Sequence, residues 1–356
     1  MIYTRYLISQ IHKGALLVLV ILVFLSLFFT LIQQLDNIGK GNFGALQFIQ
    51  YLIMRMPSMV VDFMPLAALL GSILSLGNLA SNSELIAFQT TGLSIKKFIL
   101  VVLQAGFILA LLSFLIADYI VPYSETQAKE LKSSSIAARI SMHSKRGVWI
   151  KDANNIIFAE QLFPNGNARH VEIYQLDDKG RLQISMTAEN AIAGAKGWRL
   201  QKVRQTVFNG DKVDVVNHHE WFYRGGLSDQ LLESLVVDPR LMSIASLRNY
   251  VSFLDDNQLN NEAEALALWR KIYAPVTILV MTLLAVPFVL GSQRQSNTGQ
   301  RLVTGILLGL GFVVLNRVLI QLGEQLSLMA PINAFLPTLI FLLITVWLIR
   351  EKLANR

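Results

Sequence analysis

Three charged residues, Asp62, Asp118 and Arg317, lie inside or at the ends of long apolar stretches of the sequence. An ionisable side chain is costly in such surroundings, so each of the three is a candidate functional residue. Four basic residues lie at the same level along these stretches or just beyond it: Lys40, Arg55, Lys129 and Lys132. A cluster of cations at the edge of an apolar region suits the anionic head of an amphiphile.

Lys129 and Lys132 stand out in this basic cluster, because a spacing of three places both on one face of a helix. A plainer interpretation is open for the same charges. Long basic side chains extend from apolar segments towards water, and Arg317 can pair with the carboxylate of Asp62 or Asp118. The sequence therefore leaves both a ligand-binding and a structural role open for Arg317.

No motif for catalysis or for a cofactor accompanies these charges. The sequence has no G-x-x-x-x-G-K-[ST] loop for nucleotide phosphates, no H-E-x-x-H, no nucleophile elbow and no cysteine. The pair His218-His219 does not chelate one metal, since neighbours in a strand face opposite ways. We expect no catalytic residue, metal site or cofactor in this chain; a membrane glycosyl- or phosphotransferase using Asp62 and Asp118 stays open as an alternative.

The distribution of charge divides the 356 residues into three parts. Only 15% of the residues are charged, against about 25% in soluble proteins, and residues 122–270 hold 18 of the 31 Lys and Arg and 18 of the 24 Asp and Glu. We expect apolar segments over residues 1–121 and 271–356, with a polar domain over 122–270. The balanced charge of this domain argues against nucleic-acid binding, despite the net charge of +7.

Six apolar stretches are long enough, or nearly so, to cross a bilayer, whose hydrocarbon core takes about 20 helical residues. They are Gly14–Leu35, Met59–Leu79, Phe98–Val121, Ile272–Leu290, Leu302–Leu322 and Asn333–Ile349. The first is too long for a signal peptide and lacks a cleavage site, so it is a retained span. The sequence thus predicts a polytopic membrane protein with six transmembrane helices.

Basic residues predict the orientation of these spans, because they are enriched in the cytoplasmic segments of membrane proteins. With the N-terminus inside, nine of them fall on the cytoplasmic side, and two, Lys40 and Arg55, fall in the short outside connections. Both termini are then cytoplasmic. The domain over 122–270 lies outside, in the periplasm of a Gram-negative cell.

A polar helix and a series of short β segments are expected in the outer domain. Residues 123–140 suit a helix that continues the third span beyond a kink at Pro122. From Gly147 onward, eight alternating segments predict a sandwich or a jelly roll. These segments are GVWIKD, NIIFAE, VEIYQL, LQISMTA, ENAIAGA, WRLQKV, KVDVVN and HEWFYR. Ser243 is placed to cap a short helix, and a further helix from about Glu262 runs into the fourth span.

The loop between the second and third spans carries a second candidate site. Ser83 can cap a short helix that Gly92 ends, with Leu85 among its apolar residues. Glu84 and Phe88 are four apart and so share one face of that helix. A short helix at the cytoplasmic face can lie in the membrane interface or serve as a docking knob for a partner protein.

Four segments together resemble the lipopolysaccharide-export permeases. They are PLAALLG at Pro65–Gly71, SELIAFQTTGLS at Ser83–Ser94, GVWIKDANN at Gly147–Asn155 and DPRLMSIASLRNYVSFL at Asp238–Leu254. The resemblance covers essentially the whole chain, which looks closer to one of the family's two paralogous permeases than to the other. It implies six transmembrane helices with a periplasmic β-jellyroll inserted between the third and the fourth.

The resemblance also implies partners and a substrate. In the family, two permeases form a heterodimer, here with an LptF-like chain, on a dimer of an LptB-like ATPase that binds ATP and Mg. A single-span LptC-like protein packs against the first span and passes lipopolysaccharide, or lipooligosaccharide, to a periplasmic LptA-like bridge. This chain is then a non-catalytic permease subunit in a bacterial inner membrane. A permease for another anionic lipid or for lipoproteins is a further alternative.

On this resemblance, two sets of residues gain specific roles. The family's basic pair beyond the third span falls on Lys129 and Lys132, as Lys rather than Arg, and a Lys acts on phosphate as a point charge whereas an Arg binds with two parallel bonds. The loop helix corresponds to the family's coupling helix, which contacts the ATPase, and Glu84 matches its acidic position. Thr30 stands where some members carry a basic residue, and Lys40 or Arg317 can compensate for it.

Overall fold

The computed structural model forms two compact units. It describes residues 2–35, 38–39, 43–90, 94–137, 148–152, 155–162, 167–177, 181–194, 197–209, 212–223, 239–256, 259–290, 298–326 and 328–354. The first unit comprises Met1–Ile38, Leu52–Ser124 and Ala265–Arg356, and is helical. The second comprises Gly39–Tyr51 and Glu125–Glu264, and contains the sheet.

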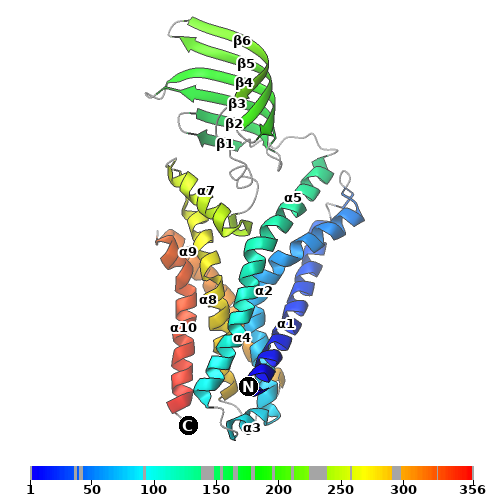
Figure 1. Ribbon diagram of the computed structural model, residues 1–356, viewed down its shortest axis with the longest axis vertical. Coiled ribbons are helices and arrows are strands. Elements are labelled where there is room, and N and C mark those ends of the chain that lie inside the picture. The colour runs from blue at the N-terminus through cyan, green and yellow to red at the C-terminus, as the bar shows by residue number, and fades with distance from the viewer. Residues whose placement is uncertain are drawn as a thin grey trace. The chain divides into compact units, whose positions relative to one another are not determined.

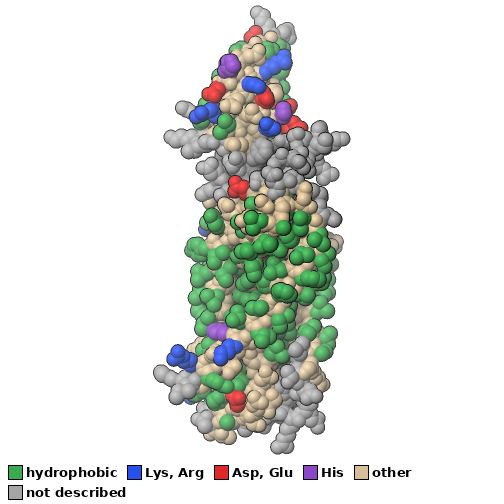
Figure 2. All heavy atoms as spheres, turned by 90° about the vertical axis from the view of Figure 1, so that its right-hand side faces the viewer, with side chains coloured by type: hydrophobic (Ala, Val, Ile, Leu, Met, Phe, Trp, Pro, Cys, Tyr) green, Lys and Arg blue, Asp and Glu red, His purple; other side chains and the backbone are tan. Residues whose placement is uncertain are grey.

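Six helices are long and apolar enough to cross a membrane, as the sequence predicted. They are α1 (Ile2–Gln34), α2 (Ala45–Ser81), α4 (Ile95–Leu115) with its continuations, α8 (Glu262–Leu290), α9 (Thr298–Gln325) and α10 (Ala330–Ala354). Both chain ends and the short helix α3 (Glu84–Thr90) lie at the same end of the helical unit (Figure 1). Figure 2 shows hydrophobic side chains covering one face of these helices, with basic side chains gathered towards that end. The six helices thus present the apolar surface that a bilayer requires.

The third span continues beyond Pro122 without ending, as the sequence predicted. A π-helical turn, η2 (Ile116–Ile120), joins α4 to α5 (Val121–Ala137), and the Val121 amide donates to the Ile116 carbonyl. Proline has no amide hydrogen with which to bond the carbonyl four residues earlier, and a wide turn accommodates that loss. The remainder of the predicted helix, residues 138–140, lies outside the described residues.

Helices α1 and α2 cross at a point where only small residues separate their backbones. A Cβ atom on Gly14 would lie 2.6 Å from the Gly71 carbonyl oxygen, and one on Gly71 would lie 2.3 Å from the Ala15 nitrogen. The Ser75 hydroxyl donates to the Gln10 carbonyl over 2.8 Å. Small residues let helix backbones approach closely in membranes, where apolar side chains gain little by leaving lipid. This crossing therefore fixes α1 to α2.

The second unit contains one antiparallel sheet of six strands in sequence order, consistent with a jellyroll-like domain inserted between the third and fourth spans. The strands are β1 (Val148–Asp152), β2 (Asn155–Leu162), β3 (Ala168–Leu176), β4 (Leu182–Gly194), β5 (Gly197–Asn209) and β6 (Lys212–Tyr223). Its buried cluster includes Ile157, Ile173 and Leu200 on one face. No second sheet occurs among the described strands, so a two-sheet sandwich is not observed there.

Eight predicted β segments became six strands, because the expected breaks within β4 and β6 do not occur. In β4, Glu189 and Asn190 both face outward between the buried Ala188 and Ala191. The neighbouring strands show the same pattern, and His170 in β3 and Lys202 in β5 adopt positive φ angles of 47° and 51°. A shift in the alternation of side chains thus resembles a strand boundary in the sequence. In the structure it is a crease that crosses three paired strands.

Helix α7 (Ile244–Asp256) begins where the sequence predicted, after the short 3-10 helix η3 (Pro239–Leu241). The Ser243 hydroxyl accepts a bond from the Ser246 amide over 3.1 Å, and its carbonyl accepts one from the Leu247 amide. These bonds satisfy amide groups of the first turn that have no partner inside the helix. The predicted helix from Glu262 into the fourth span is likewise confirmed as α8.

Candidate functional site

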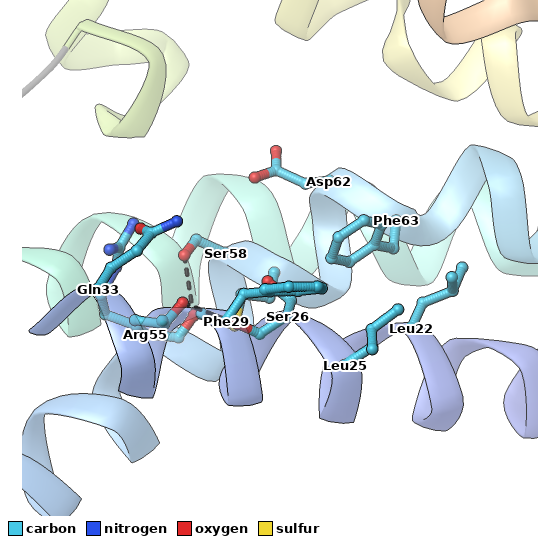
Figure 3. A pocket seen from close by; sticks show the side chains of 11 residues that line it. Leu22, Leu25, Ser26, Phe29, Gln33, Arg55, Ser58, Asp62 and Phe63 are labelled. Carbon is cyan, nitrogen blue, oxygen red and sulfur yellow. Dashed lines mark hydrogen bonds between the residues drawn. The ribbon is translucent and has the colours of Figure 1, made fainter. Parts of the chain in front are cut away.

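A pocket of about 460 Å³ lies between the C-terminal half of α1 and the N-terminal half of α2 (Figure 3). Its walls combine charged, polar and apolar side chains: Leu22, Leu25, Ser26, Phe29, Thr30, Gln33, Arg55, Ser58, Met59, Asp62 and Phe63. Two of them, Arg55 and Asp62, are candidate residues from the sequence. The sequence placed Arg55 in a loop, but it lies within α2, because this helix begins at Ala45, well before the apolar stretch from Met59.

The pocket has a polar and an apolar end. Because α1 and α2 run in opposite directions, the end of α1 lies beside the N-terminal half of α2. Gln33, Arg55 and Ser58 line one end, and Leu22, Leu25 and Phe63 line the other (Figure 3). The Ser58 hydroxyl donates to the Arg55 carbonyl over 2.9 Å, and the Thr30 hydroxyl donates to the Ser26 carbonyl over 2.8 Å. Both hydroxyls thus donate hydrogen bonds to backbone carbonyls of their own helices. The pocket takes its polar character from a guanidinium, a carboxylate and an amide, an arrangement that suits an amphiphile with an anionic head.

Asp118 pairs with Lys271, a residue that sequence reasoning missed. The Lys271 Nζ atom lies 3.8 Å from Asp118 Oδ1, and the two side chains are only 9% and 18% exposed. Lys271 immediately precedes the apolar stretch assigned to the fourth span, and the basic pair Arg270-Lys271 at that edge was the available signal. The pair joins α8 to the π-helical turn of the third span.

Arg317 is exposed on α9, and among the described residues no ion pair holds it. The structural pairing with Asp118 that the sequence left open does not occur, since Lys271 occupies that carboxylate. The ligand-binding role of Arg317 stays a prediction.

Lys129 and Lys132 lie on α5 in the second unit, and both are half-buried. The Lys132 Nζ atom lies over the ring of Tyr51, 5.5 Å from its centre. A cation over an aromatic face is held there electrostatically. Lys40 and Gly92, two further candidate residues, lie outside the described residues.

The predicted loop helix exists as α3, but it begins differently from the prediction. Ser83 has a φ angle of 59°, in the left-handed region, and its carbonyl accepts a hydrogen bond from the Ala87 amide. A side-chain cap requires an extended backbone, so the predicted capping role is wrong in this detail. Leu85 is fully buried in a cluster with Leu7 of α1 and Leu76 of α2, which holds α3 against the helical unit.

The two residues that share one face of α3 both contact Tyr6 of α1. The Tyr6 hydroxyl donates to Glu84 Oε2 over 2.9 Å, and the centres of the Tyr6 and Phe88 rings are 6.0 Å apart. Sequence reasoning assigned Glu84 and Phe88 to an external partner and missed Tyr6. Only the fold brings residues 78 positions apart together.

Charged pairs in the sheet lie on its outer surface. Lys202 donates to Glu189 over 2.5 Å, and this bond lowers the pKa of Glu189. The His170 Nδ1 atom lies 3.2 Å from Glu160 Oε2, and His170 belongs to the same crease. His218 bonds the Gln205 amide oxygen over 3.1 Å, and no cluster of three or more potential ligands that could hold a metal occurs in the described parts of the chain.

Known proteins resemble the chain along its whole length. A model of the family "Lipopolysaccharide export system permease LptF/LptG" matches residues 5–351. The permease proteins LptG of Haemophilus influenzae and of Escherichia coli K12 are each 30% identical over 351 residues, covering 98% of both chains. The permease protein LptF of E. coli K12 is 24% identical over 339 residues, covering 88% of this chain and 85% of its own length. The family predicted from the four sequence segments is confirmed, and LptG is the nearer of these paralogues.

Proposed function

The chain belongs to the LptF/LptG family of lipopolysaccharide export system permeases, and we propose that it is the LptG-type subunit of an ATP-driven exporter in the bacterial inner membrane. In this role it extracts lipopolysaccharide or lipooligosaccharide from the outer leaflet and passes it towards a periplasmic bridge. The observation that carries the proposal is the pocket between α1 and α2, where Arg55 and Asp62 lie in otherwise apolar spans. A permease for such a lipid needs a place for an anionic head beside its acyl chains.

The lipid head binds through cations at the outer end of the spans. Arg55 offers a planar fork that matches two phosphate oxygens, and Arg317 on α9 is a second candidate cation of the helical unit. Lys129 and Lys132, in the other unit, are candidate contacts of their own. A phosphate attracts these cations more strongly at the edge of the apolar region than in water, because the effective dielectric constant is lower there. Asp62 in the wall of the pocket repels an anion, so it favours shallow, reversible binding that permits release.

The chain works with partners that supply energy and continue the path. The family includes two permeases, LptG and LptF, so this chain pairs with an LptF-like second permease. An LptB-like ATPase dimer binds ATP and Mg and pushes on α3, an LptC-like single-span protein receives the lipid, and an LptA-like bridge carries it onward. Both termini and α3 are then cytoplasmic and the sheet unit is periplasmic, as the basic residues indicate.

The transferase alternative gains no support, because the relatives are export permeases. The chain thus moves its lipid rather than modifying it. Hydrolysis of ATP belongs to the partner.

The test measures lipid released per ATP hydrolysed by the complex reconstituted in vesicles. Arg55→Glu and the double change Lys129→Glu with Lys132→Glu should each reduce release at least about tenfold, whereas Arg55→Lys should retain part of it. Arg248→Glu, on the exposed side of α7, is the matched control for a reversed charge. Release at the wild-type level in both the Arg55→Glu and the double variant contradicts the assignment of the head group to these cations.

A further inference from the structure

Tyr6 joins the cytoplasmic loop helix to the first span through two different contacts. Its hydroxyl donates to Glu84 over 2.9 Å, and its ring packs 6.0 Å from that of Phe88. Next to it, Leu7 and Ile11 are fully buried in the same cluster as Leu85. The first turns of α1 and the helix α3 are therefore held together as one body.

We propose that α1 is a lever, with Tyr6 as the residue on which α3 acts, the Gly14–Gly71 crossing as its pivot, and the pocket between α1 and α2 as its output. The inference rests on the proposed function in one respect, namely that the partner ATPase moves α3. A displacement of α3 then tilts α1 about the crossing and changes the width of the pocket that holds the lipid head.

The crossing has the properties of a pivot. The backbones of α1 and α2 touch there, since Cβ atoms on Gly14 or Gly71 would lie within 2.6 Å of backbone atoms of the other helix. The Ser75 bond to the Gln10 carbonyl anchors the contact at one point along α1. Close contact between small residues fixes the two backbones at this point. Beyond it, Val18 packs against Ala67 and Leu70 of α2, and the side chains further along α1 are largely exposed.

The two arms of α1 differ in length and in packing. At 1.5 Å per residue, Tyr6 lies about 12 Å from Gly14, and Phe29 in the pocket lies about 22 Å beyond it, so a movement at α3 grows roughly twofold at the pocket. The apolar stretch of α1 is only 22% buried, and Phe24 of the long arm is 72% exposed within this chain. The long arm packs on α2 near the crossing, through Val18, and its exposed side chains lie beyond it. The short arm is buried against α2, α3 and α4.

Cysteine substitutions can report the movement directly, because the chain has no native cysteine. Phe29→Cys on α1 and Met59→Cys on α2 place spin labels on opposite walls of the pocket. In the complete reconstituted complex, the distance between the labels should change when ATP is added with vanadate to trap the ATPase. A distance that stays the same in the wild-type background overturns the lever.

Variants of Tyr6 then separate the lever from a merely structural role. Tyr6→Phe keeps the ring and removes the bond to Glu84, and Tyr6→Ala removes both contacts. ATP hydrolysis should persist in both variants. Lipid release per ATP should fall about tenfold in Tyr6→Ala and less in Tyr6→Phe. The change in distance between the labels should shrink in the same order. Tyr3→Phe, a neighbouring tyrosine packed against the same cluster, should leave both readouts unchanged.

Glu84→Gln distinguishes transmission through Tyr6 from a direct charge contact with the ATPase. A glutamine keeps an oxygen that accepts the Tyr6 hydroxyl, so the lever predicts near-normal coupling in this variant and impaired coupling in Tyr6→Phe. The reverse order overturns the lever and assigns Glu84 to the partner. Failure of the proposed function looks different, since the wild-type complex itself then releases no lipid on adding ATP.

Discussion

Two ion pairs of the same chemical kind occupy opposite environments in this molecule. Lys271 and Asp118, in the helical unit, have side chains 9% and 18% exposed, whereas Lys202 and Glu189, in the sheet unit, have side chains 69% and 48% exposed. The buried pair is long at 3.8 Å and the exposed pair short at 2.5 Å. A short distance between the charged atoms thus does not show how much a pair matters to stability, because the cost of an unpaired charge depends on its surroundings.

The largest effect is expected from breaking the buried pair on one side. Lys271→Met leaves the Asp118 carboxylate uncompensated beside the π-helical turn and should destabilise the helical unit by about 3–5 kcal/mol. Thermal unfolding of the purified complex in detergent measures this. The double variant Lys271→Met with Asp118→Leu should recover much of the loss, since neither charge then remains. A double variant as unstable as Lys271→Met contradicts the pairing.

A core change in the sheet unit should have the next largest effect. Ile173 is fully buried in the sheet cluster, so Ile173→Ala should cost about 2–4 kcal/mol through lost contacts and a cavity. Val215→Ala, on the exposed β6, is the control and should change the melting temperature little. Equal effects of the two changes would show that this face is not a closed core in solution.

The same face tests whether the sheet unit carries lipid. Ile173 is closed off by its neighbours in this structure, and the partly buried Ile184 packs against the same cluster. A photo-crosslinking residue at either position should label lipid only during ATP turnover, because the cluster must open first. The absence of labelling in either condition argues for a permanently closed core, and labelling without ATP shows that the cluster does not need ATP turnover to open.

Removing the Ser243 cap should have a smaller effect. Ser243→Ala loses the bond to the Ser246 amide at the start of α7 and should cost about 1 kcal/mol, measured by thermal unfolding. Ser243→Asp retains a capping oxygen and should be close to wild type. A loss in Ser243→Asp equal to that in Ser243→Ala would show that the capping oxygen is not the source of the lost stability.

The smallest effect is expected at the exposed pair, and it depends on pH. The bond from Lys202 lowers the pKa of Glu189, so the stability that this pair adds is present above the ordinary glutamate pKa and is lost as pH falls through the lowered value. Melting curves of wild type and Glu189→Gln should therefore differ slightly at neutral pH and converge in acid. Added salt should also reduce the difference. A difference that grows in acid contradicts the pair.

Local features of the sequence were enough to predict much of the fold. Six apolar stretches predicted six spans, and the helix from Glu262 and the cap at Ser243 followed from neighbouring residues alone. The prediction wrongly divided β4 into two segments, because a crease at Glu189 breaks the alternation of side chains without ending the strand. Arg55 was placed in a loop because apolar periodicity shows where a span is densest, not where its helix begins.

The sequence by itself determined that this chain spans a membrane and belongs to an exporter family, since hydrophobic length and local motifs are properties of consecutive residues. Only the tertiary structure decided which charges meet. It paired Asp118 with Lys271 rather than Arg317, gathered Gln33 and Arg55 into one pocket, and brought Tyr6 to Glu84. Such contacts join residues far apart in the chain, and they depend on how helices cross, which small residues such as Gly14 and Gly71 determine by letting two backbones touch.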